Sequence, residues 1–216
     1  MSRLSLVAAT LLIPSILHAQ AAGAGRPGPR HLMARDQEIA LARSAAPAAV
    51  TDGARVLVWT GQSYDVADPG KTGVVCLVNR SWPESLEPEC YDAEAARTIM
   101  PMEIRRTELY HAGTPADKVE AEIASGLLDG RYRLPIRPAM AYMMSAGQQL
   151  VGDDGQKVGA WKPHLMLYVP YLTNAEIGMT TPDIRAGMVV DEGKPTANLM
   201  VVVPSFVQPK APGPTR

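Results

Sequence analysis

The chain has 216 residues, of which 46% are hydrophobic and 20% charged, and its 21 basic side chains nearly balance 22 acidic ones. This composition is typical of one globular domain, and a net charge of −1 argues against nucleic acid or a polybasic membrane segment as its main partner. Two cysteines are too few for a disulfide-dense scaffold or a four-thiolate zinc site, and no apolar run reaches the roughly 18 residues of a spanning helix.

The first 21 residues have the pattern of a secretory signal peptide. Arg3 supplies a positive start, an apolar run of 14 residues extends from Leu4 to Leu17, and small residues follow. The run is long enough to enter an export channel and too short to remain as a membrane anchor. We predict cleavage after Ala21, with Ala19 as the alternative site, and therefore a secreted or periplasmic protein without a membrane span after cleavage.

Composition divides the rest of the chain into three parts. Residues 22–34 are rich in Gly and Pro and are predicted to form a flexible linker. Residues 207–216 are predicted to be a disordered, proline-rich tail. The folded part is then a single domain over residues 35–206, a length that suits one hydrophobic core.

The domain begins with the signals of one helix and then of short strands. Asp36 is the expected N-cap of a helix over 37–44. The turns between the following β-rich segments are too short for parallel crossovers, so we predict an antiparallel meander over residues 54–80. The three segments of this meander are 55–60, 63–67 and 73–79.

Helical patterns occupy the middle of the domain and β-rich segments return after them. Residues 92–112 are predicted helical with a break at Pro101, and Thr114 is the expected N-cap of a further helix. This order predicts an α+β fold, in which two or three helices are inserted between the N-terminal meander and the C-terminal strands of a mostly antiparallel sheet. The candidate C-terminal strands are 139–146, 164–169, 186–190 and 198–203.

The two cysteines are predicted to form a structural disulfide between Cys76 and Cys90. Oxidising compartments favour disulfides, and the loop of 13 residues between the cysteines contains Pro83 and Pro88, which predict a stiff, irregular path. The alternative is a catalytic thiol at Cys76 with His164 as its base. An apolar β-like run surrounds Cys76, however, and such surroundings raise rather than lower the pKa of a thiol.

Residues 161–171 (WKPHLMLYVPY) form the predicted binding surface. In a strand, alternation places His164, Met166 and Tyr168 on one face and aliphatic residues on the other. We expect the aliphatic face in the core, and the face with the imidazole, thioether and phenol to line a ligand pocket. The alternative is a half-buried strand whose polar groups make structural hydrogen bonds. The candidate ligand-binding residues are Trp161, His164, Tyr168 and Tyr171.

His164 could also be a catalytic residue. A cofactor-free hydrolase would use it with a polar partner, for which the candidates are Asp65, Ser145 and Tyr168. The sequence contains no complete G-x-S-x-G, H-E-x-x-H, Walker or G-x-G-x-x-G motif, so binding without catalysis and without a cofactor is our leading hypothesis.

A metal site is the third hypothesis, with His164 and Met166 as ligands. Soft thioethers and imidazole suit copper outside the reducing cytosol, and further thioethers are near in sequence at Met140, Met143 and Met144. The H-x-M element at residues 164–166 resembles part of the motif of periplasmic copper chaperones of the cupredoxin-like type. The family's upstream methionine falls at Tyr142 here, one residue before Met143, and its upstream histidine has no counterpart.

Three arginines, Arg131, Arg133 and Arg137, lie close together in the sequence. Carboxylates are frequent in the helical region before them, and we interpret the group as a solvated, salt-bridged surface.

The leader, the segment EIALARSAAP at 38–47, the Cys76/Cys90 pair and PHLMLYVPY at 163–171 together resemble small exported bacterial proteins of unassigned function. The resemblance implies export and carries over no functional residue. The leading hypothesis is thus an exported, periplasmic, non-enzymatic protein that binds a small ligand or a component of the cell envelope.

Overall fold

The computed structural model describes residues 32–80, 85–150, 162–181, 183 and 185–210. The predicted signal peptide, most of the predicted linker, Trp161 and the last six residues of the predicted tail lie outside the described residues. The described helices are α1 (Arg35–Arg43), α2 (Ala48–Thr51), α3 (Ala95–Thr98), α4 (Met100–His111) and α5 (Ala116–Leu128). The described strands are β1 (Arg55–Trp59), β2 (Tyr64–Asp68), β3 (Val75–Asn79), β4 (Glu87–Tyr91), β5 (Ala139–Met143), β6 (His164–Tyr168), β7 (Met188–Val190) and β8 (Asn198–Val202).

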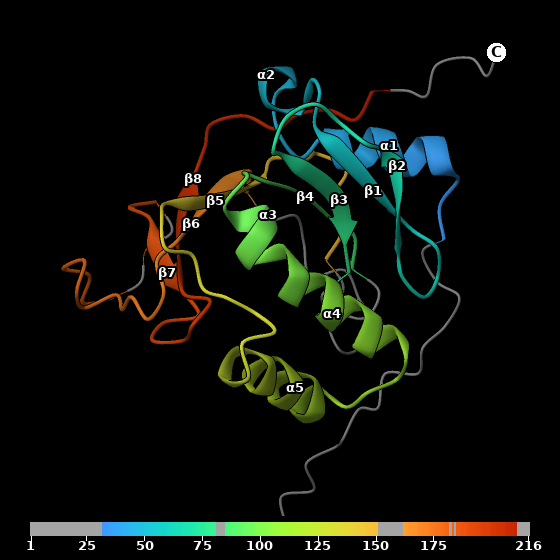
Figure 1. Ribbon diagram of the computed structural model, residues 1–216. Helices are drawn as coiled ribbons and strands as arrows, with labels where there is room; N and C mark the ends of the chain where they lie inside the picture. Colours follow the sequence, from blue (N-terminus) through green and yellow to red (C-terminus); the bar gives the residue numbers. More distant parts are fainter. Residues whose placement is uncertain (1–31, 81–84, 151–161, 182, 184, 211–216) are drawn as a thin grey trace, which may run out of the picture.

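The strands form one sheet in the order β2-β1-β3-β4-β5-β6-β8-β7. Every neighbouring pair is antiparallel except β1 and β3, which are parallel. Helices α3, α4 and α5 lie between β4 and β5 in the chain, and Figure 1 shows α3 and α4 in front of the sheet, with α5 beside α4. The predicted α+β class, the mostly antiparallel sheet and the inserted helices are confirmed. Among the described residues, no helix is long and apolar enough to cross a membrane.

The predicted N-terminal meander is wrong in its pairing. Strand β3 does not pair with β2 but lies on the other side of β1, with Val56 opposite Cys76. The physical reason is burial: every residue of β3 is buried, whereas β2 is half-exposed. The apolar strand therefore takes the inner position, and the more polar YDVAD segment forms the edge of the sheet.

Helix positions agree with the sequence patterns, but two expected caps are wrong. Helix α1 begins at Arg35 after Ala34, so Asp36 lies in the first turn, where a carboxylate still interacts favourably with the positive helix end. Helix α5 has Pro115 at its N-cap in place of Thr114. The predicted break at Pro101 is confirmed, because this proline lies in the first turn of α4, directly after α3.

Two helical layers cover different parts of the sheet. Helices α3, α4 and α5 cover one face, where core residues such as Leu77, Tyr91 and Met102 pack together. Helix α1 packs on the opposite face of β1, β3 and β4, against residues such as Val56 and Val78. We call the part of this second face that β5, β6, β8 and β7 form the open face. It carries the partly exposed Leu165, Leu167, Leu199 and Val201.

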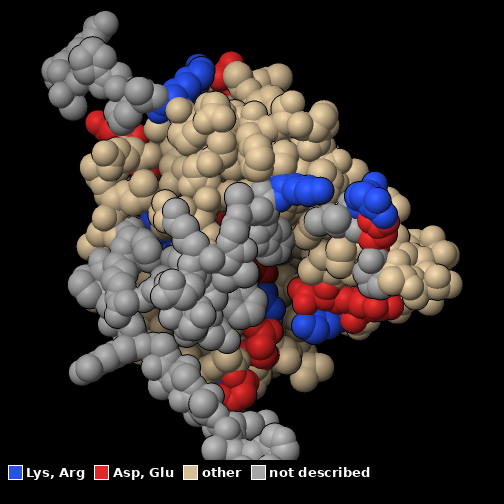
Figure 2. Space-filling view, turned by 180° about the vertical axis from the view of Figure 1, so that it is seen from behind, with Lys and Arg blue, Asp and Glu red and all other residues tan. Residues whose placement is uncertain are grey.

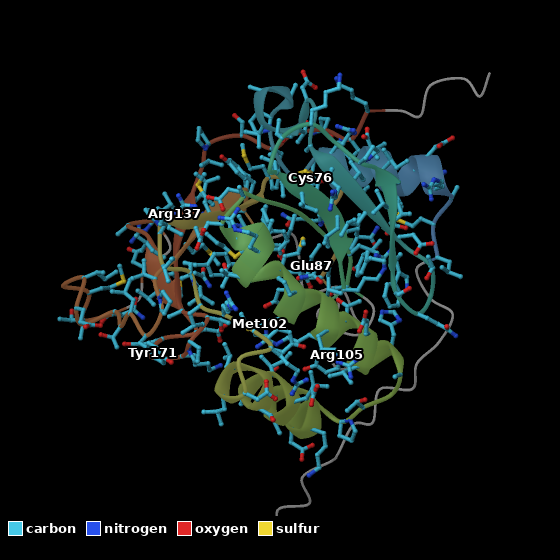
Figure 3. The ribbon with its side chains drawn as sticks, viewed as in Figure 1. Cys76, Glu87, Met102, Arg105, Arg137 and Tyr171 are labelled. Carbon is cyan, nitrogen blue, oxygen red and sulfur yellow. A yellow bond between two sulfur atoms is a disulfide. The ribbon has the colours of Figure 1, made fainter. Side chains whose placement is uncertain are left out.

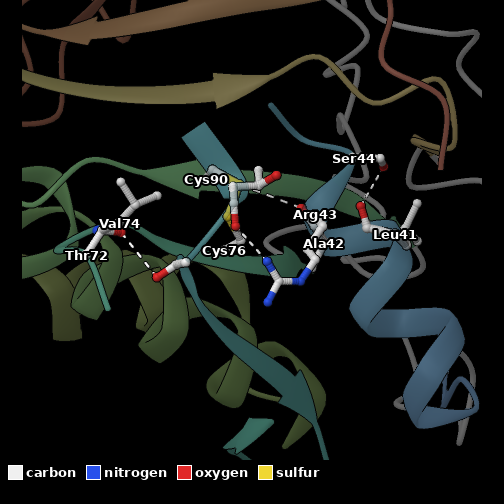
Figure 4. Close-up of a disulfide and its surroundings, with 10 residues drawn as sticks. Leu41, Ala42, Arg43, Ser44, Thr72, Val74, Cys76 and Cys90 are labelled. Atoms are coloured by element: carbon white, nitrogen blue, oxygen red, sulfur yellow. Dashed lines mark hydrogen bonds between the residues drawn. A yellow bond between two sulfur atoms is a disulfide. The ribbon is translucent and has the colours of Figure 1, made fainter. Parts of the chain in front are cut away.

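The predicted Cys76–Cys90 disulfide is confirmed. The two cysteines lie directly opposite each other on β3 and β4, with an S–S distance of 2.05 Å. Both are fully buried, and Cys90 Sγ lies 3.7 Å from the carbonyl oxygen of Ala42 on α1 (Figure 4). The catalytic-thiol alternative is therefore wrong. The expectation of an irregular path through Pro88 is also wrong, because this residue belongs to β4.

The described fold continues beyond the last strand. Val207 accepts a backbone hydrogen bond from the N–H of Ala146 and donates its own N–H to the carbonyl of Met144. These bonds attach the first residues of the predicted tail to the segment after β5.

Candidate ligand-binding site

Strand β6 alternates as the sequence predicts, but the predicted assignment of its faces is inverted. His164, Met166 and Tyr168 are buried, and the latter two belong to the core under α4, whereas Leu167 and Val169 are exposed by 37% and 43%. Period-two alternation assigns residues to faces, yet the covering layer decides which face is inside. The helices cover the face that carries the imidazole and phenol, so the aliphatic residues lie on the open face.

His164 is a core residue of this helix-covered face. It is 1% exposed, and its Nδ1 lies 2.7 Å from the carbonyl oxygen of Lys162. Burial lowers the pKa of the imidazole, and this effect outweighs that of the Lys162 carbonyl, which acts in the opposite direction. The neutral ring is therefore the favoured form.

The three proposed hydrolase partners of His164 lie in different surroundings. Asp65 lies on β2, five strands away at the other end of the sheet. The hydroxyl of Ser145 lies 2.6 Å from that of Ser44, and the Tyr168 hydroxyl lies 3.9 Å from Met166 Sδ. Each of these two hydroxyls thus has a neighbour of its own.

The thioethers expected near His164 separate into two sets. Met143 lies directly opposite His164, and Met200 lies directly opposite Met166, all on the helix-covered face. Met140 lies on the open face, opposite Leu167. The part of the chain that the structure describes contains no cluster of three or more His, Cys, Asp or Glu residues able to hold a metal ion.

The remaining two predicted ligand-binding residues are Trp161 and Tyr171. Trp161 lies outside the described residues. Tyr171 is 57% exposed in the turn after β6, has a φ of 66°, and donates its backbone N–H to the Lys194 carbonyl. Figure 3 shows Tyr171 on the same side of the molecule as Arg137.

An apolar groove lies where β5 begins and β6 ends. Its volume is about 610 Å3, and two chain segments form most of its walls, Pro135–Met140 and 167–170. Ile136, which is 91% exposed, contributes the most accessible apolar side chain. Asp92 and Arg137 are the charged residues at its edge. We call this site the apolar groove.

A second groove, of about 880 Å3, adjoins the first through Ile136 and Arg137. Glu94 is the one carboxylate that lines it, against four arginines. We call it the arginine groove. On the back of the molecule, by contrast, acidic and basic side chains gather together around a hollow (Figure 2). The arginines that line the groove are Arg97, Arg131, Arg133 and Arg137.

Glu94 holds the loop that forms the common wall of the grooves. Its Oε1 accepts the backbone N–H of Ile136 at 3.2 Å, and its Oε2 lies 2.6 Å from Arg97 and 3.6 Å from Arg137. Burial alone would raise the pKa of Glu94, but the Ile136 N–H and the two guanidinium groups outweigh it and lower the pKa. The carboxylate is therefore ionised when it binds the loop.

The other end of the loop is fixed by packing. The ring of Tyr132 lies against Gly126 on α5 so closely that a Cβ at position 126 would approach ring atoms within 2.3 Å. Arg131 lies over the same ring at 5.8 Å and forms ion pairs with Glu122 and Asp129. A bulkier residue than Gly126 would displace this ring, so the loop geometry depends on the glycine.

A polar cluster lies inside the helix-covered face. The hydroxyl of Tyr91 donates to Glu89, and Glu87 projects from the same face of β4. Burial raises the pKa of Glu89 well above its ordinary value, and the charge of Glu87 raises it further. Figure 3 labels Glu87 beside the sheet and Met102 beside α4, and Met102 belongs to the same core cluster as Tyr91. These contacts describe a buried network that joins β4 to the core.

Comparison with protein-family models, with curated proteins and with solved structures found no match. The site is therefore described from this chain alone. The sequence prediction named the 161–171 segment, of which residues 167–170 line the apolar groove, and did not include Ile136 or Glu94 among the site residues. The run Leu134-Pro135-Ile136 between two arginines was the available signal, since it places apolar side chains in a segment that the sequence assigns to no helix or strand.

Proposed function

We propose that the protein is an exported, non-enzymatic binding protein that holds a small apolar ligand, or an apolar part of an envelope component, in the apolar groove. The observation that carries this proposal is the position of Ile136, 91% exposed beside the Leu167 and Val169 side chains of the open face. Burying such a side chain contributes about 1.5–3 kcal/mol, so an apolar partner would gain stability from contact there.

The shape of the groove supports a small ligand. Its volume of about 610 Å3 is in the range of pockets that bind small molecules. Its wall is held before any ligand arrives, because Ile136 is tied through its backbone N–H to Glu94. A wall fixed in advance lowers the entropic cost of binding.

Export rests on two independent features. The first 21 residues have the pattern of a signal peptide, and a disulfide joins Cys76 to Cys90. Disulfides persist in the periplasm and outside the cell, and are rare in the reducing cytosol. An exported protein with an apolar groove would meet envelope lipids, nutrients and the apolar parts of envelope proteins.

The experiment is a fluorescence titration of the full chain, purified from the periplasm of an expression host, with the uncharged apolar probe N-phenyl-1-naphthylamine. We expect saturable binding that Ile136→Ser weakens by about tenfold, because a change of roughly 1.4 kcal/mol is one factor of ten in affinity. Leu128→Ser is the matched control, since Leu128 is also 91% exposed but lies at the end of α5 outside the groove. Equal effects of the two variants, or no saturable binding, would contradict the proposal.

A second candidate function is copper handling. The observation in its favour is that Met143 lies directly opposite His164, with Met166 on the same face of β6, so that imidazole and thioether groups project together. Copper loading followed by elemental analysis tests it. One copper per chain, and less in Met166→Leu, would support the candidate; a metal-free loaded protein would eliminate it.

A further inference from the structure

The structure also points to the chemistry of the ligand, in an inference that rests on the proposed function. We infer that the ligand is a single-chain anionic amphiphile, whose apolar chain occupies the apolar groove and whose anionic headgroup lies in the arginine groove. The first step is continuity: Ile136 and Arg137 line both grooves, so one molecule can extend from one to the other.

The second step is the charge of the arginine groove. Its four arginines face one lining carboxylate, Glu94, which already accepts the Ile136 N–H. Arg97 is close to Glu94 at 2.6 Å, and Arg131 is held by Glu122 at 2.7 Å and Asp129 at 2.9 Å. These two guanidinium groups are therefore already neutralised by carboxylates of the chain.

The other two arginines are the available ones. Arg137 has a longer contact with Glu94, 3.6 Å, and its side chain is 70% exposed. Arg133 is exposed, and the ion pairs between described residues do not include it. Guanidinium groups bind carboxylate and phosphate oxygens through paired, charge-assisted hydrogen bonds. An anion in this groove would thus meet two arginines that no carboxylate of the described chain neutralises closely.

The third step is the combination of the two grooves. Nucleic acid or free phosphate would contact the arginines and leave the apolar groove empty. An uncharged hydrophobic molecule would occupy only the apolar groove. A molecule with one apolar chain and one anionic end satisfies both. Carboxylate and phosphate headgroups share this chemistry, so a fatty acid and a single-chain phospholipid are the two sources to distinguish.

The test is calorimetric titration below the critical micelle concentration with dodecyl phosphate, dodecanoate and dodecyltrimethylammonium, which share a twelve-carbon chain. We expect the anions to bind at least tenfold more tightly than the cation, and their affinity to fall as salt is added. The stronger of the two anions identifies the headgroup source. Equal affinity for the anions and the cation would overturn the inference.

Variants separate the inference from the proposed function. Arg133 lines the arginine groove and not the apolar groove, so Arg133→Gln should weaken dodecyl phosphate by about two- to fivefold and leave the uncharged naphthylamine probe unchanged. Lys118→Gln is the matched control, because the Lys118 side chain is 71% exposed on α5 and lies outside both grooves. If the uncharged probe binds in an Ile136-dependent manner but the arginine variant leaves dodecyl phosphate unchanged, the inference fails and the proposed function stands. If no probe binds, the proposed function fails as well.

Discussion

The backbone N–H of Ile136 donates a hydrogen bond to Glu94 Oε1 at 3.2 Å, across 42 residues of sequence. This contact joins the start of α3 to the loop before β5, and that loop forms the wall between the apolar and arginine grooves. One carboxylate therefore fixes an exposed apolar side chain and limits the positive charge beside it. The two effects can be separated by substitution.

Glu94→Gln should separate the positioning of Ile136 from the effect of the negative charge on the arginines. A glutamine oxygen still accepts the Ile136 N–H, so the wall stays in place, while the negative charge near Arg97 and Arg137 is lost. We expect dodecyl phosphate to bind about two- to fivefold more tightly, the range for ion pairs with exposed arginines such as Arg97 and Arg137, with no change for the uncharged probe. Glu94→Ala should weaken both ligands. Equal weakening of both ligands by Glu94→Gln would contradict this division of roles.

The buried ion pair between Arg80 and Glu38 should be a major element of stability. Arg80 Nη1 lies 3.0 Å from Glu38 Oε1, both side chains are almost fully buried, and the same oxygen accepts the backbone N–H of Trp59. Removing the carboxylate takes away the negative charge that Arg80 contacts in the core, so Glu38→Ala should lower the free energy of unfolding by about 3–5 kcal/mol.

Urea denaturation measures that change. The control is Lys194→Ala, because Lys194 and Asp191 form an exposed pair at 2.8 Å whose loss should cost less than about 1 kcal/mol. A Glu38 variant no less stable than the Lys194 variant would show that the buried pair does not stabilise the fold.

The disulfide should stabilise the fold by restricting the unfolded chain. Cys76 and Cys90 are 14 positions apart, and closing a loop of this length contributes about 2–4 kcal/mol. The double variant Cys76→Ala/Cys90→Ala should therefore melt at a lower temperature than the oxidised protein in a calorimetric scan. An unchanged melting temperature would mean that the sheet alone sets the register of β3 and β4.

Glu89 should make stability depend on pH. Its pKa is raised in the folded state, so the folded protein binds this proton more tightly than the unfolded chain does. Stability then falls as pH rises above the ordinary value of 4.5, until the buried carboxyl ionises. Glu89→Gln keeps an acceptor for the Tyr91 hydroxyl and has no charge, so its advantage over the native protein should be larger at pH 8 than at pH 5. Urea titrations of both proteins at the two pH values measure it, and an equal difference at both would contradict the prediction.

Local patterns in the sequence predicted much of this fold. β-rich segments located β5, β6 and β8, Pro101 located the break between α3 and α4, and the cysteine count together with the predicted export predicted the disulfide. These signals depend on neighbouring residues, on backbone geometry or on redox environment, and each can be read without knowing the tertiary contacts.

The predictions that were wrong concern features that depend on long-range packing. The parallel pairing of β1 with β3 follows from which strand is buried, and the inverted faces of β6 follow from which side α4 covers. The candidate site depends on Glu94 reaching Ile136, a contact between residues that share no motif. The arginines were interpreted as a solvated surface. The described ion pairs support that interpretation for Arg131, whereas Arg133 remains outside them.

The most direct measurement is a methyl NMR titration of the full chain with dodecanol, an uncharged ligand with one apolar chain. The account predicts that the methyl resonances of Ile136, Leu167 and Val169 shift together and saturate, while those of Leu128 stay in place. Shifts confined to Met143 and Met166, on the helix-covered face beside His164, would instead place the ligand in the core and contradict the assignment of the apolar groove as the binding site.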